Sequence, residues 1–298
     1  MTPPVGAPFP TSLAYHRHEA TRVMRDLFES GCSGVSGAYR VGSSVAGCDA
    51  VAVRSCYELE PEWFSPLRQL NQKPVLGLGH FPPTDKHDIS GGATDSEDIF
   101  KWLGERKAGS VTYVAFGTEW LLNRKQAQEL ARGLELSNLP YIWALRSEPG
   151  VLPPGFEERN RDRGLVRRRF LPRLKILAHP SVGGFMTHCG WNSLVEALQS
   201  GVAFVLVPFA NDHGHNARLM AEKKLGVEVP SKEDDGSFSG VDVAKALRLV
   251  MADKEGEEYR TRAKMVQEML GNEEVHDRYV KDAVELLKEK RATAKSAS

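Results

Sequence analysis

The sequence lacks an excess of charge of either sign, because 39 lysines and arginines balance 39 aspartates and glutamates among 298 residues. No global field favours nucleic acid or an anionic membrane, so neither is expected as a partner. No apolar run approaches the roughly 18–20 residues that cross a bilayer, the longest being Gly201 to Ala210. Because no signal peptide is visible either, we expect a cytoplasmic protein that works as a monomer.

Cysteine is also scarce, and no two cysteines form a CxxC pair. The four are Cys32, Cys48, Cys56 and Cys189. Their scattered positions argue against a zinc site and give no disulfide framework. We therefore interpret them as free thiols in a reducing compartment.

What the sequence does contain is a regular alternation of short apolar runs and amphipathic stretches. Strands are expected at 110–116, 141–146, 165–170, 185–187, 203–207 and 227–229, with helices at 99–106, 192–201 and 215–224 among others between them. This spacing predicts an α/β fold whose parallel sheet is covered on both faces. Two charged amphipathic helices, 257–270 and 277–290, are expected near the end.

The first 80 residues show the same alternation, cut off at its front. A helix is expected at 12–30, strands at 49–54 and 74–78, and a helix at 60–70. His16 and His18 lie near the start of the first helix, and we interpret them as ordinary helix or surface residues. The predicted domain organisation is an N-terminal α/β part (1–80), a Pro- and Gly-rich linker (81–98), a C-terminal sheet domain (99–270), a helix (271–290) and a flexible tail (291–298).

The densest group of polar residues lies between 183 and 201. A short strand leads through the turn His188-Cys189-Gly190-Trp191 into a helix, and Ser193 and Glu196 fit a capping box. Unpaired N–H groups at a helix start, with the helix dipole behind them, suit a phosphate or diphosphate. The alternative is that these residues only cap a helix and pack a core. Their density beside glycines favours a ligand site.

Ligands in an open parallel sheet bind outside the carboxyl ends of the strands. Four loops leave the predicted strands there: 116–118, the segment after Phe170, 188–193 and 208–213. Together they offer a hydroxyl, an aromatic ring, a phosphate cradle and an Asp with a His. That inventory matches a nucleotide diphosphate that carries a polar group such as a sugar.

The 44 residues from Phe170 to His213 closely resemble the signature box of the plant secondary-product UDP-glycosyltransferases, family 1, without a gap. Segments 114–117, 152–157 and 55–60 also look like family motifs. Val51-Ala-Val-Arg-Ser-Cys56 is similar to the branch that adds a sugar to the sugar of an existing glycoside. The resemblance implies a GT-B fold, with a complete Rossmann-like C-terminal domain and the remnant of an N-terminal acceptor domain.

The resemblance also implies roles for the residues that match the box. Phe170, where Trp is usual, would stack on uracil, and the Leu171 backbone would hydrogen-bond the base. Arg173 stands where Gln is usual, and Glu196 would bind the ribose hydroxyls. The residues that would hold the diphosphate are Thr118, His188, Asn192 and Ser193, and those that would bind the sugar are Trp191, Asp212 and His213. No metal or cofactor is expected, because the UDP-sugar is a co-substrate and the helix terminus with neutral donors can stabilise the leaving UDP.

The function that the resemblance implies is inverting transfer of a sugar to a hydroxyl of a small-molecule glycoside, a flavonoid or terpenoid glycoside by branch. His213 stands where Gln is typical of glucosyl transfer, which favours UDP-rhamnose or UDP-galactose over UDP-glucose. The family's catalytic His and Asp map onto no residue here, so no catalytic residue is assigned. The competing hypotheses are a noncatalytic, truncated UDP-sugar-binding protein or incomplete gene model, and a motif that serves only sheet packing.

Overall fold

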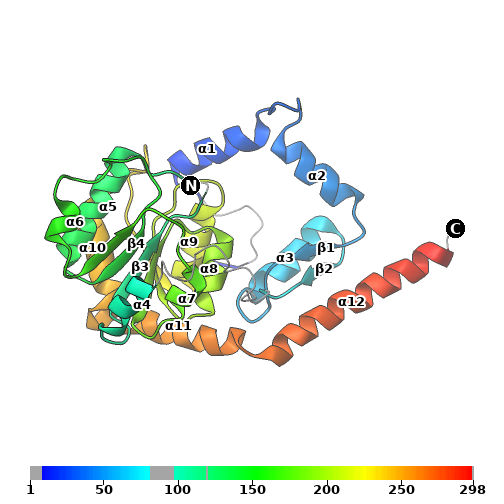
Figure 1. The fold of residues 1–298 in the computed structure, drawn as a ribbon. Coiled ribbons are helices and arrows are strands. Elements are labelled where there is room, and N and C mark those ends of the chain that lie inside the picture. Colours follow the sequence, from blue (N-terminus) through cyan, green and yellow to red (C-terminus); the bar gives the residue numbers. More distant parts are fainter. Residues whose placement is uncertain (1–8, 81–96, 119, 297–298) are drawn as a thin grey trace.

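A computed structural model describes residues 9–80, 97–118 and 120–296 (Figure 1). The chain forms a large lobe around a six-stranded sheet and a small lobe around a two-stranded sheet. Most of the predicted linker, 81–98, lies outside the described residues. Among the helices that are described, none is long and apolar enough to cross a membrane.

The large lobe is built on a wholly parallel sheet. Its strands are β3 (Val111–Ala115), β4 (Tyr141–Ala144), β5 (Gly164–Arg167), β6 (Val182–Thr187), β7 (Ala203–Leu206) and β8 (Gly226–Glu228). They lie in the order β5-β4-β3-β6-β7-β8, and every neighbouring pair is parallel. Because β3 and β6 start the two halves, the strand order reverses between them, which is where such sheets bind ligands. The predicted α/β parallel-sheet fold is confirmed.

Helices cover both faces of this sheet, as Figure 1 shows. They are α4 (Glu97–Gly104), α5 (Arg124–Ser137), α6 (Phe156–Arg159), α7 (Arg173–Leu177), α8 (Trp191–Leu198), α9 (His213–Glu222), α10 (Gly240–Met251), the 3-10 helix η3 (Lys254–Gly256) and α11 (Glu257–Leu270). Helices α5 and α10 pack on each other so closely that a Cβ on Gly133 would lie 2.4 Å from Val243 Cγ1. Strands β3, β6 and β7 are buried almost entirely, so their apolar runs form the core between the helix layers.

The small lobe contains β1 (Val51–Val53), α3 (Pro61–Asn71) and β2 (Val75–Gly77), close to where the sequence predicts them. Helix α1 (Arg17–Phe28) is shorter than the predicted 12–30. It begins after His16, whose backbone N–H donates to Glu19 Oε2 at 2.8 Å and so caps the helix start. Helix α2 (Gly37–Gly47) was not predicted, because it is glycine-rich and buries no residue.

The C-terminal helix α12 (Glu273–Ser296) continues through residues that we expected to form a flexible tail. It returns to the small lobe, where the hydroxyl of Tyr279 accepts from the backbone N–H of Tyr57 at 2.7 Å and donates to Glu58 Oε2 at 2.6 Å. Arg278 pairs with the same glutamate. These contacts hold the first turns of α12 against the small lobe (Figure 1).

Candidate functional site

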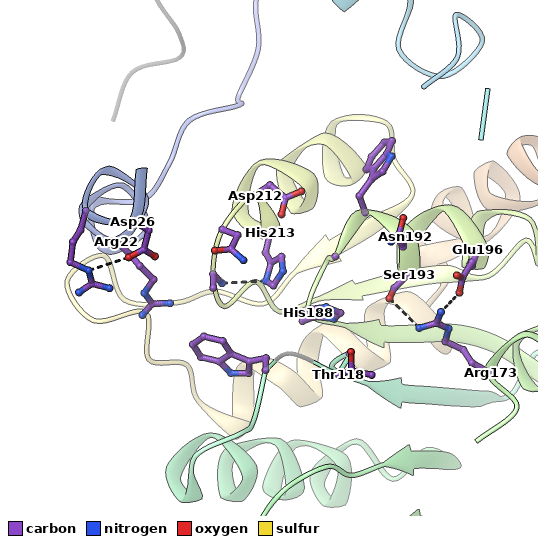
Figure 2. Close-up of a pocket in the computed structure, with 17 residues that line it drawn as sticks. Arg22, Asp26, Thr118, Arg173, His188, Asn192, Ser193, Glu196, Asp212 and His213 are labelled. Atoms are coloured by element: carbon purple, nitrogen blue, oxygen red, sulfur yellow. Dashed lines mark hydrogen bonds and ion pairs between the residues drawn. The ribbon is translucent and has the colours of Figure 1, made fainter. Parts of the chain in front are cut away.

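Two adjoining cavities lie at the carboxyl ends of the strands, at the point where the strand order reverses. The larger, of about 800 Å³, is shown in Figure 2. The smaller, of about 260 Å³, shares part of its wall with the larger. Between them the cavities are lined by every residue that the sequence singled out for donor binding: Thr118, Phe170, Leu171, Arg173, His188, Trp191, Asn192, Ser193, Glu196, Asp212 and His213. The topology therefore brings together residues that are up to 95 positions apart, from Thr118 to His213.

The helix start at the centre of this site differs from the prediction in one respect. Helix α8 begins at Trp191, with Gly190 as its N-cap and no side-chain capping bond. Ser193 and Glu196 are thus inside the helix, and the predicted capping box is wrong. Because no side chain caps the helix, the N–H groups of its first residues, which line the larger cavity, keep hydrogen-bonding capacity for a ligand.

Ser193 and Glu196 instead face Arg173 at the start of α7 (Figure 2). Arg173 forms an ion pair with Glu196, and its Nη1 donates to Ser193 Oγ at 3.4 Å. These three residues line both cavities and so mark where they meet. The departure from the family's usual Gln consequently adds a cation next to the carboxylate that would bind the ribose.

The His188 ring lies close to two glycines. A Cβ on Gly117 would lie 2.7 Å from His188 Nε2, and a Cβ on Gly190 would lie equally close, at 2.7 Å. Burial, with smaller contributions from His213 and Arg173, lowers the pKa of His188 to about 3. The imidazole is therefore neutral near pH 7, and it can donate one hydrogen bond without carrying charge.

His213 packs edge-on against His188, with ring centroids 4.7 Å apart. Its Nδ1 accepts from the backbone N–H of Ala210 at 3.2 Å. A neutral His213 consequently carries its proton on Nε2, where it can serve as a donor. The neighbouring Asp212 accepts from Asn216 Nδ2 at 2.9 Å, which fixes the direction of its carboxylate.

Phe170, the residue predicted to stack on uracil, is 56% exposed and lines the smaller cavity. The guanidinium carbon of Arg146 lies 4.9 Å from the centre of its ring, a cation–π contact. The guanidinium covers one face of the Phe170 ring. A base would therefore either stack on the opposite face or displace the guanidinium.

Sequence reasoning missed several residues of the site. Arg146 and Arg169 line the smaller cavity, and Arg22, Arg25, Asp26 and Trp120 line the larger. The rule that ligands bind at the carboxyl ends of parallel strands also predicts Arg146, because this residue follows β4 at the same sheet edge. The rule does not predict the α1 residues. Nothing in the sequence indicates that α1 lies against the loop after β7, where Arg22 donates to the carbonyl of Phe209.

The other histidines considered, His16 and His18, lie outside both cavities at the start of α1 and contact Glu233. This placement fits the interpretation of both as ordinary helix residues.

His80 is fully buried, with its Nε2 3.2 Å from Cys56 Sγ. Burial lowers the pKa of His80 to about 4 and raises that of Cys56 to about 12, so both are neutral and the thiol is not activated. Within the described residues, no group of three or more His, Cys, Asp or Glu side chains could hold a metal ion.

The chain is similar to known proteins both in sequence and in structure. Residues 94–268 match the protein-family model "UDP-glucoronosyl and UDP-glucosyl transferase". UDP-glycosyltransferase 91C1 of Arabidopsis thaliana is 44% identical over 98% of this chain and 63% of that protein. Soyasaponin III rhamnosyltransferase of Glycine max is 37% identical over 99% of this chain and 63% of that protein. The chain thus spans about 63% of the length of these curated relatives.

Among solved structures, a UDP-glucose:anthocyanidin 3-O-glucosyltransferase in complex with UDP matches with a TM-score of 0.75 and 28% identity, over 89% of this chain and 60% of that one. The parallel sheet, the position of the cavities and the family match agree with one another. The large lobe is the Rossmann-like C-terminal domain of the GT-B fold, and the chain belongs to the UDP-glucoronosyl and UDP-glucosyl transferase family.

Proposed function

We propose that the two adjoining cavities bind a UDP-sugar. The observation that carries this proposal is the uncapped start of α8, around which the predicted donor residues line one continuous wall. Phe170 and the Leu171 backbone hold uracil in the smaller cavity, and Glu196 binds the ribose diol where the cavities meet. In the larger cavity, the α8 N–H groups with His188, Asn192 and Ser193 hold the diphosphate. Trp191, Asp212 and His213 bind the sugar beyond it.

The proposed reaction is inverting transfer of that sugar to a hydroxyl of a flavonoid or terpenoid glycoside. The hydroxyl oxygen attacks the anomeric carbon in line, the bond from that carbon to the diphosphate oxygen breaks, and UDP leaves with the electron pair. The N–H groups and the neutral His188 stabilise the charge that develops on UDP, so the step uses no metal. The proton of the hydroxyl passes to a general base, a role to which no residue of this chain is assigned.

An alternative proposal is a UDP-sugar-binding protein without transferase activity. What favours it is that none of the residues lining the two cavities is assigned the role of general base. The two functions make the same prediction for nucleotide binding and differ in turnover. Incubation of the protein with UDP-sugars and glycoside acceptors, followed by detection of released UDP, separates them.

A measurement of UDP binding tests both functions against the hypothesis that the polar motif at 183–201 only packs the sheet. UDP at 100 times its dissociation constant is expected to stabilise the protein by about 2.7 kcal/mol, measured as a shift in thermal unfolding. Glu196→Gln removes the charged acceptor for the ribose diol, so UDP affinity should fall by about 10- to 100-fold. Glutamine rather than alanine is chosen because it keeps a partner for Arg173.

The matched control is Glu255→Gln, which removes one exposed carboxylate in η3, away from both cavities. It should bind UDP like the wild type. The wild type should also prefer UDP over 2′,3′-dideoxy-UDP, and Glu196→Gln should lose most of that preference. Absence of any shift with saturating UDP would refute nucleotide binding, whereas an unchanged preference in the variant would refute only the role of Glu196.

His213 is proposed to favour UDP-rhamnose or UDP-galactose over UDP-glucose. We expect His213→Gln to move the preference toward UDP-glucose by about 2- to 10-fold, the value of one hydrogen bond. Competition of the three donors against UDP, measured by calorimetry for wild type and variant, checks this prediction. UDP itself is the internal control, since it lacks the sugar and should bind both proteins alike. Unchanged ratios of the three affinities would show that another residue selects the sugar.

A further inference from the structure

Arg54 connects the small lobe to the start of α8. It follows β1, so it lies at the carboxyl end of the two-stranded parallel sheet, next to His80, which follows β2. Its Nε and Nη2 both donate to the carbonyl oxygen of His80, at 3.1 and 2.9 Å. Two bonds to one carbonyl fix the plane of the guanidinium. The remaining nitrogen, Nη1, is thereby directed toward the large lobe.

There, Arg54 contacts the first two residues of α8. Its Nη1 donates to the side-chain oxygen of Asn192, and its backbone carbonyl accepts from the indole N–H of Trp191 at 3.0 Å. One residue of the small lobe therefore holds both the amide of Asn192 and the ring of Trp191. The contact spans 138 positions in sequence.

The bond to Asn192 determines which end of its amide is left for a ligand. An amide has an oxygen that accepts and an NH₂ that donates, at opposite ends of one planar group. Because Arg54 binds the oxygen, the NH₂ is the end that remains for the cavity. A diphosphate offers only acceptors, so this orientation suits it, whereas the flipped amide would bring an oxygen against phosphate oxygens.

Arg54 itself is not among the residues that line the two nucleotide cavities. It lines a separate cavity of about 260 Å³ between the lobes, together with Trp191 and Asp212. Arg54 can thus influence a nucleotide through the residues that it holds. A direct charge contact with phosphate would require it to leave the bonds to His80 and Asn192.

We propose that Arg54 is a positioning residue for the donor site, whose guanidinium orients the Asn192 NH₂ toward the diphosphate, while its backbone carbonyl holds Trp191 at the start of α8. This inference rests on the proposed UDP-sugar binding and deepens it, because it makes donor affinity depend on the small lobe. Arg54 stands in the Val51–Cys56 segment, outside the 44-residue signature box, so the box residues do not complete the donor site by themselves.

The experiment is a double-mutant cycle on UDP affinity, measured by calorimetry with the full chain. Arg54→Gln should weaken UDP binding about 10-fold, the value of a lost charge-assisted bond. Asn192→Ala should weaken it by a similar factor. In the Asn192→Ala background, Arg54→Gln should change affinity by less than about 2-fold, since the group that Arg54 orients is gone. Arg54→Lys keeps a donor and should restore part of the loss.

Two controls accompany the cycle. Arg161→Gln removes one charge from a side chain that is 75% exposed and remote from the cavities, and it should bind UDP like the wild type. Thermal unfolding without ligand shows whether each variant is folded. An Arg54→Gln protein that binds UDP like the wild type would overturn the proposal. So would an equal loss in both backgrounds, which would assign Arg54 a direct contact with the nucleotide. A wild type that does not bind UDP would instead refute the proposed function, and the role of Arg54 with it.

Discussion

Gly117→Ala is expected to reduce UDP affinity at least 10- to 100-fold, because the added methyl group has no room beside His188. Gly117 has a φ of +74°, and its Cβ would lie 2.7 Å from both Cε1 and Nε2 of the imidazole. The backbone of Gly190 also lies near this edge of the ring, where a Cβ would come within 2.7 Å of Nε2, so the imidazole has little room to move. A displaced His188 would lose its hydrogen bond to the nucleotide and narrow the cavity, and each effect costs on the order of 1 kcal/mol or more. Calorimetry with UDP measures the result.

Gly150→Ala is the matched control for this substitution. Gly150 has the same φ of +74°, but a Cβ there meets nothing within 4 Å. Both variants therefore carry the strain of a left-handed alanine, about 1–2 kcal/mol, and both should unfold at a lower temperature. Only Gly117→Ala should also lose UDP affinity. If the two variants bound UDP equally well, the close packing of His188 against glycines would not matter for the nucleotide.

The sequence was informative where a signal is local. Strands such as Ala203–Leu206 are continuous apolar runs, and the rule that ligands bind at the carboxyl ends of parallel strands indicates the loops that line the two cavities. The start of α10 is likewise set by a local contact, since Ser239 accepts from the backbone N–H of Asp242. For these elements, a few neighbouring residues decide the structure.

The capping box at Ser193 shows where local signals mislead. Its spacing is correct, but the N-cap of α8 is Gly190, three residues before Ser193, and the helix begins at Trp191. Arg173, on a different helix, then takes Glu196 as its partner. A tertiary ion pair thus replaced the local hydrogen bond that the spacing predicted.

Contacts between the lobes were beyond sequence reasoning altogether. Arg54 meets Asn192 across 138 positions, and Tyr279 meets Glu58 across 221. Each pair depends on how two sheets and a returning helix are placed in space, and no spacing rule covers such separations. The same reason explains why α1 was not expected to contribute Arg22 and Asp26 to the larger cavity.

The second large effect is expected for Arg218→Met, which should destabilise the protein by about 3–5 kcal/mol at pH 7. Arg218 is only 8% exposed and forms ion pairs with Glu19 of α1 and Glu228 of β8, the latter at 3.0 Å. Methionine fills similar space without the charge, leaving two carboxylates facing each other away from water. Urea unfolding of wild type and variant measures the difference. Arg161→Met, at an exposed position, should cost less than about 0.5 kcal/mol.

The pH dependence of this loss tests its electrostatic cause. Burial already raises the pKa of Glu228, and Arg218 opposes that rise. Without the guanidinium, the pKa of Glu228 in the folded protein should rise further above its value in the unfolded chain. A carboxylate with a raised folded-state pKa favours folding when protonated, so the deficit of Arg218→Met should be largest at pH 7 and shrink toward pH 4. Glu19→Gln in the same variant should recover part of the stability at pH 7. A deficit that is equally large at both pH values, with no recovery from Glu19→Gln, would mean that Arg218 stabilises this junction by packing alone.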